Sequence, residues 1–210
     1  PVLDVGILMA PRGLGTMIAM MIVGKLSGKI DPRPLILLGL VLTAVSLWEM
    51  TQFSSFVPES WIVRSGITQG LGLGFIFVPL STIAFATLDA KYRTEAAGLF
   101  SLVRNLGSSI GVSIVVTLLG KSIQTNHSYL AEHITRYNTG LATDFIPHTM
   151  GNMTVALTFL DAEINRQAAT LGYINDFALM MWVAILAMPL VFLLRNPHRL
   201  VEEEIPVMVD

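Results

Sequence analysis

Five apolar stretches, each roughly 20 residues long or longer, constrain the fold of this chain more than any other feature, because a helix needs that length to cross a membrane. They run from Val5 to Val23, Pro34 to Phe53, Trp61 to Leu88, Ala96 to Leu119 and Phe177 to Leu194. Backbone polar groups inside a bilayer must be satisfied within the chain, so such stretches must be helical. The sequence therefore predicts an all-α, polytopic membrane protein with about five transmembrane helices.

Composition supports this class and excludes others. The chain has 210 residues, of which 53% are hydrophobic and only 13% charged, far from the balance of a soluble domain. Its net charge of -2 and scattered basic residues exclude nucleic acid as an expected partner. It has no cysteine, which excludes disulfides and thiolate metal sites, and no His-Glu-x-x-His motif, facing aspartate pair or credible set of nucleophile and base, so no enzyme activity is expected. The start at Pro1 suggests a fragment of a longer protein.

Basic residues predict the orientation, since Lys and Arg gather in the cytoplasmic loops of membrane proteins. Three basic groups alternate along the chain so that they fall on one side of five spans: Lys25, Lys29 and Arg33; Lys91 and Arg93; Arg195 and Arg199. The amino-terminal end is therefore expected outside and the carboxyl terminus in the cytoplasm, in the inner (cytoplasmic) membrane.

The predicted organisation has four parts. Residues 1–119 form four transmembrane helices, 120–176 a periplasmic or extracellular helical segment, 177–194 the last span and 195–210 a cytoplasmic tail. The outer segment repeats apolar residues at steps of three and four from Ile123 and again from Met153, which predicts an amphipathic helical hairpin. This hairpin either packs on itself or the membrane, or docks a helical partner.

One apolar stretch carries both an arginine and a glycine stripe. Arg64 leads a segment in which Gly66, Gly70 and Gly74 recur at every fourth residue, followed by Pro79. Glycines at this spacing allow a neighbouring helix to approach closely. An arginine near hydrocarbon must face protein or a water-filled cavity. The glycines predict helix packing, and the arginine marks a candidate functional position.

Further ionisable residues lie in the predicted spans. Because an unpaired charge at such depth is costly, Glu49 is expected to pair with Arg12 or Arg64. The pair either anchors the helices, or Glu49 or Asp4 is a proton-binding group that a nearby arginine controls.

Other candidates have weaker patterns. Arg104 and Asn105 share helix faces with Ser108 and Ser109, so they form either a functional site or a buried polar cluster, and Gly107 and Gly111 form a second close-packing pair. Apolar ligands suit flexible or aromatic side chains, although packing is the commoner role. The candidate substrate contacts are Met17, Met20, Met21, Phe75 and Phe77.

The basic turn between the first two spans carries a resemblance. Gly24, Gly28, Lys29, Asp31 and Arg33 resemble the loop Gly-x-Leu-(Ala/Ser)-Asp-Arg-x-Gly-Arg of major facilitator transporters, although Gly28 replaces the acid of that pattern and Asp31 its later glycine. The segments 10–17, 70–80, 97–99 and 104–111 resemble the carboxyl-terminal half of drug:proton antiporters of the EmrB/QacA type. This resemblance covers essentially the whole chain.

The resemblance implies a partial major facilitator fold and a proton-coupled transporter that exports drugs or other amphipathic compounds by alternating access. It further implies no cofactor, and partners that comprise the lipid bilayer, substrates and protons and, for Gram-negative members of the family, a periplasmic adaptor and an outer-membrane channel. The alternative is a membrane-embedded scaffold or assembly subunit, in which glycine stripes mediate association and arginines only anchor.

Overall fold

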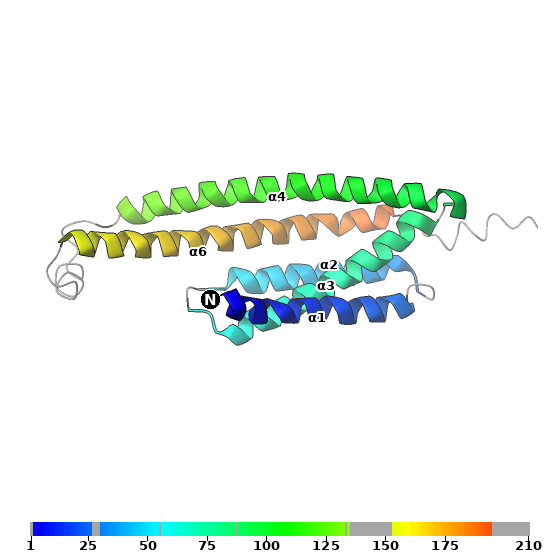
Figure 1. The fold of residues 1–210 in the computed structure, drawn as a ribbon, viewed down its shortest axis with the longest axis horizontal. Helices are drawn as coiled ribbons and strands as arrows, with labels where there is room; N and C mark the ends of the chain where they lie inside the picture. Colours follow the sequence, from blue (N-terminus) through cyan, green and yellow to red (C-terminus); the bar gives the residue numbers. More distant parts are fainter. Residues whose placement is uncertain are drawn as a thin grey trace, which may run out of the picture. The chain divides into compact units, whose positions relative to one another are not determined.

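The computed structural model describes residues 2–26, 30–54, 56–86, 88–132, 134 and 153–194. Its long helices are α1 (Val2–Leu26), α2 (Pro32–Thr51), α3 (Glu59–Ala86), α4 (Arg93–Glu132) and α6 (Met153–Ala187), and two short 3-10 helices are η1 (Ala90–Tyr92) and η3 (Pro189–Leu193) (Figure 1). Five helices in this part of the chain are long and apolar enough to cross a membrane. The prediction of an all-α protein with five spans is confirmed.

The chain divides into two compact units, which are described one at a time. Unit 1 comprises residues 1–52, 57–110 and 177–210, and unit 2 comprises residues 53–56 and 111–176. Helices α1, α2 and α3 belong to unit 1, whereas α4 and α6 each contribute residues to both. The predicted outer segment 120–176 falls within unit 2, and its position outside the bilayer stays a prediction.

Helix α2 begins where the sequence supplies a start signal. Asp31 is its N-cap, and the Asp31 carboxylate accepts a hydrogen bond of 3.2 Å from the backbone N–H of Arg33. Pro32 occupies the first helical position, where its missing N–H costs nothing. This start fixes the position of Arg33 at the beginning of α2.

Helix α3 packs against both α1 and α2, and small residues make the contacts. A Cβ atom added at Gly70 would collide with the carbonyl oxygen of Arg12 in α1. On the α2 side, a Cβ atom at Gly39 would lie 2.7 Å from the carbonyl oxygen of Gly72. The glycines of α3 therefore bring its backbone into contact with two neighbours within the same chain, as expected for close helix packing.

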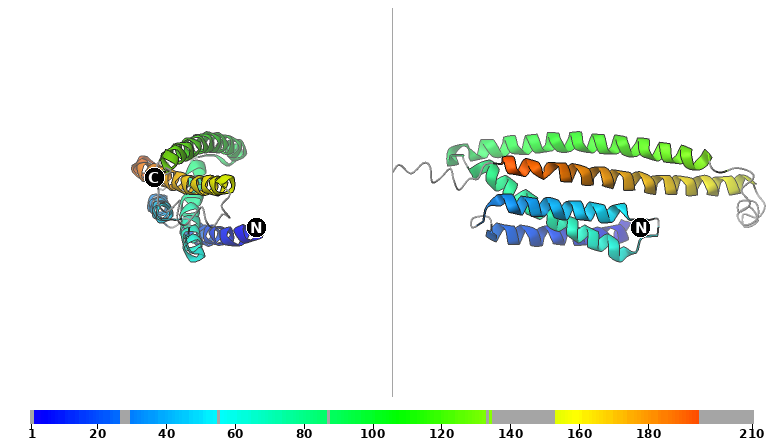
Figure 2. Two further views of the ribbon diagram at one scale, coloured as in Figure 1. Left: turned by 90° about the vertical axis from the view of Figure 1, so that its left-hand side faces the viewer. Right: turned by 180° about the vertical axis from the view of Figure 1, so that it is seen from behind.

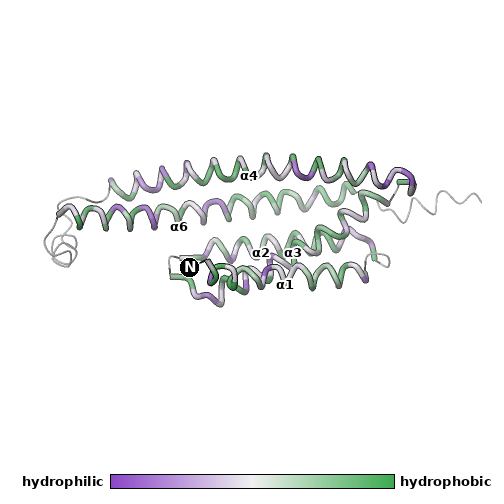
Figure 3. The backbone as a smooth tube through the Cα atoms, viewed as in Figure 1, coloured by the Kyte–Doolittle hydropathy of each residue, from purple (hydrophilic) through white to green (hydrophobic). Residues whose placement is uncertain are grey.

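Helices α4 and α6 are longer than a membrane is thick. With 40 and 35 residues, they measure about 60 and about 52 Å at 1.5 Å per residue, against about 30 Å of hydrocarbon. Both run without a break through the predicted boundaries at residues 119/120 and 176/177. Figure 3 shows hydrophilic residues recurring along the unit 2 part of α6, whereas its unit 1 part is mostly hydrophobic.

In unit 2, α4 and α6 lie side by side and antiparallel (Figure 2). A Cβ atom at Gly172 of α6 would lie 2.7 Å from Cγ1 of Ile123 in α4. His127 Nε2 lies 3.3 Å from Asp161 Oδ1, so lower numbers on one helix meet higher numbers on the other. The two amphipathic segments predicted from Ile123 and Met153 are thus the ends of α4 and α6. The predicted break at 140–151 lies outside the described residues.

Candidate functional site

A buried carboxylate and an exposed guanidinium form the central pair of unit 1. Oε1 of Glu49 in α2 lies 2.6 Å from Nη2 of Arg64 in α3. Of the two arginines considered from the sequence, the structure selects Arg64. The Glu49 side chain is 11% exposed and the Arg64 side chain 72% exposed, so the acid is held between helices while most of the arginine remains accessible.

A buried hydrogen bond between α2 and α3 lies next to this pair. Ser46, one turn before Glu49, donates a hydrogen bond of 2.8 Å to the carbonyl oxygen of Ser65, next to Arg64. Both serines are fully buried. The contact fixes how α2 and α3 meet beside Glu49, since a buried hydroxyl group requires its partner.

Arg64 also lines a groove between α1 and α3 with a volume of about 620 Å³. Its lining residues are Ile7, Leu8, Pro11, Glu59, Ser60, Val63, Arg64, Ile67 and Thr68. This size lies within the range of sites for drug-sized ligands, which combine an apolar lining with a few polar groups. The groove thus presents a mainly apolar wall with one guanidinium, that of Arg64, one carboxylate, that of Glu59, and the hydroxyl groups of Ser60 and Thr68.

Other predicted residues of α1 lie on exposed parts of the helix. Arg12 is exposed, and its backbone rather than its guanidinium meets α3, through the contact with Gly70. Asp4 is exposed as well. Met17, Met20 and Met21 are between 37% and 58% exposed and do not line the α1–α3 groove.

Arg104 of α4 lies over an aromatic ring of α3. Its Cζ atom is 5.4 Å from the centroid of the Phe77 ring, a cation–π distance. Asn105 is exposed, and Phe75 is half-buried. No described residue of another helix lies within 4 Å of a Cβ atom placed at Gly107 or Gly111, so close packing there stays a prediction.

The basic turn contributes a second link in unit 1. Nη2 of Arg33 donates a hydrogen bond to the carbonyl oxygen of Leu194, just after η3. Nε of Arg33 is buried and has no hydrogen-bond partner among the described residues. A Cβ atom at Gly24 would have open space around it, and Gly28 and Lys29 lie outside the described residues. Arg33 therefore ties the start of α2 to the end of the last span.

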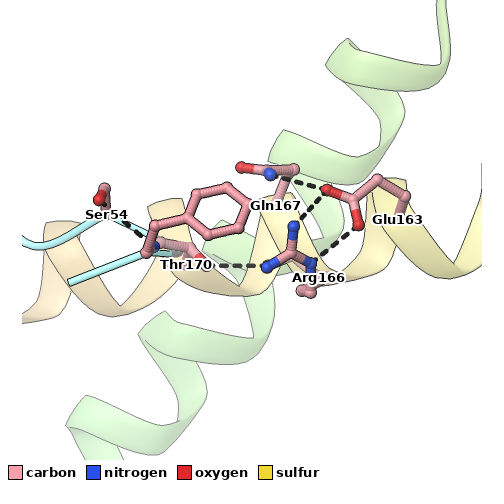
Figure 4. A network of polar contacts seen from close by, with 6 residues as sticks. Ser54, Glu163, Arg166, Gln167 and Thr170 are labelled. Carbon is pink, nitrogen blue, oxygen red and sulfur yellow. Dashed lines mark hydrogen bonds and ion pairs between the residues drawn. The ribbon is translucent and has the colours of Figure 1, made fainter. Parts of the chain in front are cut away.

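Unit 2 has a polar network on its surface (Figure 4). Arg166 binds both carboxylate oxygens of Glu163, at 2.7 and 2.8 Å, and Gln167 donates to Glu163 Oε1 at 2.8 Å. The Arg166 guanidinium also lies 5.3 Å from the centroid of the Phe56 ring, in the connection between α2 and α3. Within this network, Arg166 places the Phe56 ring beside α6.

Three features of the structure had no counterpart among the sequence predictions. They are the bond from Arg33 to Leu194, the contact of Ser46 with Ser65, and the burial of Asp176, which is only 5% exposed. The position of Asp176 directly before the apolar stretch from Phe177 was the signal that could have drawn attention to it.

Comparison with known proteins identifies the family. Residues 1–131 match the family model described as Major Facilitator Superfamily. The chain belongs to the major facilitator superfamily. This membership agrees with the five apolar helices and confirms the expected partial major facilitator fold.

Several relatives are multidrug transporters by name. The chain is 27% identical over 180 residues to the multidrug export protein EmrB of Haemophilus influenzae, covering 85% of this chain and 35% of the relative. It is 25% identical over 195 residues to the probable multidrug resistance protein EmrY of Escherichia coli, covering 91% of this chain and 38% of the relative. The chain is also 25% identical over 194 residues to the fatty acid resistance protein FarB of Neisseria gonorrhoeae, covering 91% of this chain and 38% of the relative.

The chain thus spans little more than a third of the length of these relatives. It is a multi-pass membrane protein of a transporter superfamily, similar over most of its length to multidrug exporters.

Proposed function

We propose that this chain is part of a secondary transporter that exports amphipathic compounds by alternating access, coupled to proton entry. The Glu49–Arg64 pair carries the proposal. It combines a buried carboxylate, which can bind a proton, with a guanidinium that lines a groove large enough for a drug-sized molecule. A substrate in the groove and a proton on Glu49 would both act on Arg64, and this shared partner provides a physical basis for coupling.

The packing of α3 argues against the scaffold alternative. A scaffold would need its glycine stripes free for association with other membrane proteins. In the stripe of α3, Gly70 instead faces the Arg12 carbonyl group of α1, and Gly74 faces Ala19 of the same helix. The stripe of α3 therefore serves packing within the chain, whereas Gly107 and Gly111 of α4 have no described neighbour within 4 Å of an added Cβ atom.

The proposal includes an orientation in the inner membrane. The basic residues Lys25, Arg33, Lys91 and Arg93 lie at or near the helix ends of unit 1 that join α1 to α2 and α3 to α4. By the positive-inside rule, this end faces the cytoplasm. The segment 120–176 would then be periplasmic or extracellular, and its exposed Tyr129, Phe159 and other apolar side chains would contact a periplasmic adaptor that leads to an outer-membrane channel.

The test uses the full-length protein in proteoliposomes with an imposed pH gradient and a fluorescent amphipathic substrate. The expected result is substrate movement that stops when a protonophore collapses the gradient. Glu49→Gln should flatten the pH dependence of the transport rate, while Glu95→Gln, which removes an exposed carboxylate from the first turn of α4, should leave it unchanged.

Two outcomes would contradict the proposal. Transport that is indifferent to the gradient would remove proton coupling. If Glu49→Gln lowers only the folding yield and keeps the pH profile, the pair is structural. The adaptor contact is tested separately: a protein lacking residues 120–176 that still transports in vesicles and still exports across the whole cell envelope would exclude it.

A further inference from the structure

Asp176 differs from the other buried polar residues of the described chain. Four polar or charged residues are buried there: Ser46, Glu49, Ser65 and Asp176. Ser46 and Ser65 have hydrogen-bond partners, and Glu49 has Arg64. Asp176 has no hydrogen bond or ion pair with any described residue. Burying an unpaired carboxylate costs far more free energy than burying a carboxylic acid.

The contact between α4 and α6 in unit 2 lies on the same side of α6 as this position. Ala168, Gly172 and Asp176 follow one another at steps of four, so they share one side of α6, and all three are buried. Gly172 meets Ile123 and Leu119 of α4. Asp176 lies one turn further, in a row of residues otherwise small and apolar.

A polar cluster marks the same level of the contact. Asn175 of α6 donates a hydrogen bond of 3.0 Å to Ser122 Oγ of α4, and Asn126 donates to the same oxygen at 3.4 Å. Asn175 is exposed whereas Asp176, the next residue, is buried. Asp176 therefore lies at the level of this polar cluster, and a small separation of α4 and α6 there would admit water and allow proton exchange.

No charged group in the described part of unit 2 neutralises Asp176. His127 pairs with Asp161, and Arg166 pairs with Glu163. Lys121 and Glu132 of α4 are exposed and form no ion pair with Asp176. With no counter-charge among the described residues of unit 2, a bound proton would neutralise this carboxyl group while the contact is closed.

We propose that Asp176 binds a proton within the α4–α6 contact, and that losing this proton loosens the contact. This inference rests on the proposed transport function, for which Asp176 would be a positioning residue that makes the contact at the start of the last span sensitive to pH. It acts through the packing of α4 on α6 within unit 2.

Infrared spectroscopy of the purified full-length protein tests the protonation directly. The expected result is a C=O stretching band of a protonated carboxyl group at neutral pH that disappears in Asp176→Asn and persists, shifted, in Asp176→Glu. Asp89→Asn is the matched control, because Asp89 is exposed and makes no side-chain capping bond at η1. An identical spectrum in wild type and Asp176→Asn would overturn the inference.

Hydrogen exchange tests the consequence for packing. The measured quantity is the amide protection of 111–132 and 153–176 after correction for the pH dependence of the intrinsic exchange rate. In the wild type this protection should fall by about tenfold per pH unit above the pH at which Asp176 loses its proton. In Asp176→Asn it should stay constant. Equal pH dependence in both proteins would overturn the inference. Neither measurement requires transport, so a wild type that shows both signals without proton-driven export would contradict the proposed function alone.

Discussion

Glu49 and Arg64 form an asymmetric ion pair: their side chains meet at 2.6 Å, yet the acid is 11% exposed and the arginine 72%. The two partners therefore depend on each other to different degrees. The arginine can be solvated without the acid, whereas the acid has no comparable access to solvent. Removing one partner of a buried pair is costly mainly because a buried charge remains.

This asymmetry predicts different costs for the two single substitutions. Arg64→Ala should lower the free energy of unfolding by about 3 kcal/mol, because Glu49 stays buried without a counter-charge. Glu49→Gln should cost about 1 to 2 kcal/mol, since the exposed arginine then finds water. Thermal unfolding of the purified full-length protein measures both, with Glu95→Gln as the exposed control. Equal losses for both variants would contradict the asymmetry.

The predicted parts of the fold were those encoded locally. Apolar length defines a span, and a spacing of four defines a helix face, so the five helices and the packing role of Gly70 followed from the sequence. The pairing of Glu49 was predictable because the short connection between α2 and α3 keeps it near Arg64. The choice between Arg12 and Arg64 required the structure, since it depends on how α1 and α2 meet α3.

The unpredicted parts depend on residues far apart in the chain or on polarity that changes without ending a helix. Arg33 and Leu194 are 161 positions apart, and no pattern links a loop arginine to one particular carbonyl group. The sequence after Leu119 becomes polar, which suggested a boundary. However, residues 121–132 contain neither proline nor glycine, so α4 continues to Glu132.

Gly66 and Gly70 of α3 both face Arg12 of α1, so substituting each by alanine gives a matched pair of variants. Gly70→Ala should destabilise the protein by about 1 to 3 kcal/mol, because the added Cβ collides with the Arg12 carbonyl group and α1 must move away. Gly66→Ala should be neutral or slightly stabilising, because its Cβ would lie 3.7 Å from Cβ of Arg12, an ordinary contact distance. Thermal unfolding compares the two, and equal effects would show that the α1–α3 approach does not depend on Gly70.

The Arg33–Leu194 bond predicts local loosening at the end of the last span. Arg33→Ala removes a charged donor from a carbonyl group, an interaction of about 1.5 to 3 kcal/mol. The amides of η3 should then exchange hydrogen about ten times faster or more, because 1.4 kcal/mol corresponds to tenfold. Hydrogen-exchange mass spectrometry of 189–194 measures this. Lys25→Ala, an exposed residue in the last turn of α1, is the control, and unchanged exchange in Arg33→Ala would contradict the link.

The buried hydrogen bond of Ser46 predicts a loss of folding stability that depends on both the polarity and the size of the residue at this position. Ser46→Ala should lower the free energy of unfolding by about 1 kcal/mol, since the Ser65 carbonyl oxygen loses the donor at 2.8 Å. Ser46→Val should cost more, about 1 to 3 kcal/mol beyond that, because a fully buried serine leaves no room for added methyl groups between α2 and α3.

The control for this series is Thr117→Ala, which removes an exposed hydroxyl group that donates to the Ser113 carbonyl of its own helix. That hydroxyl group bonds only a carbonyl group of its own helix that already lies within the α-helical ladder, and it holds no second helix, so its loss should change stability little. If Ser46→Ala is as mild as Thr117→Ala while Ser46→Val remains severe, steric fit alone holds α2 against α3 at this level. If both serine variants are destabilising in the predicted order, the hydrogen bond and the fit act together to keep Glu49 in place opposite Arg64.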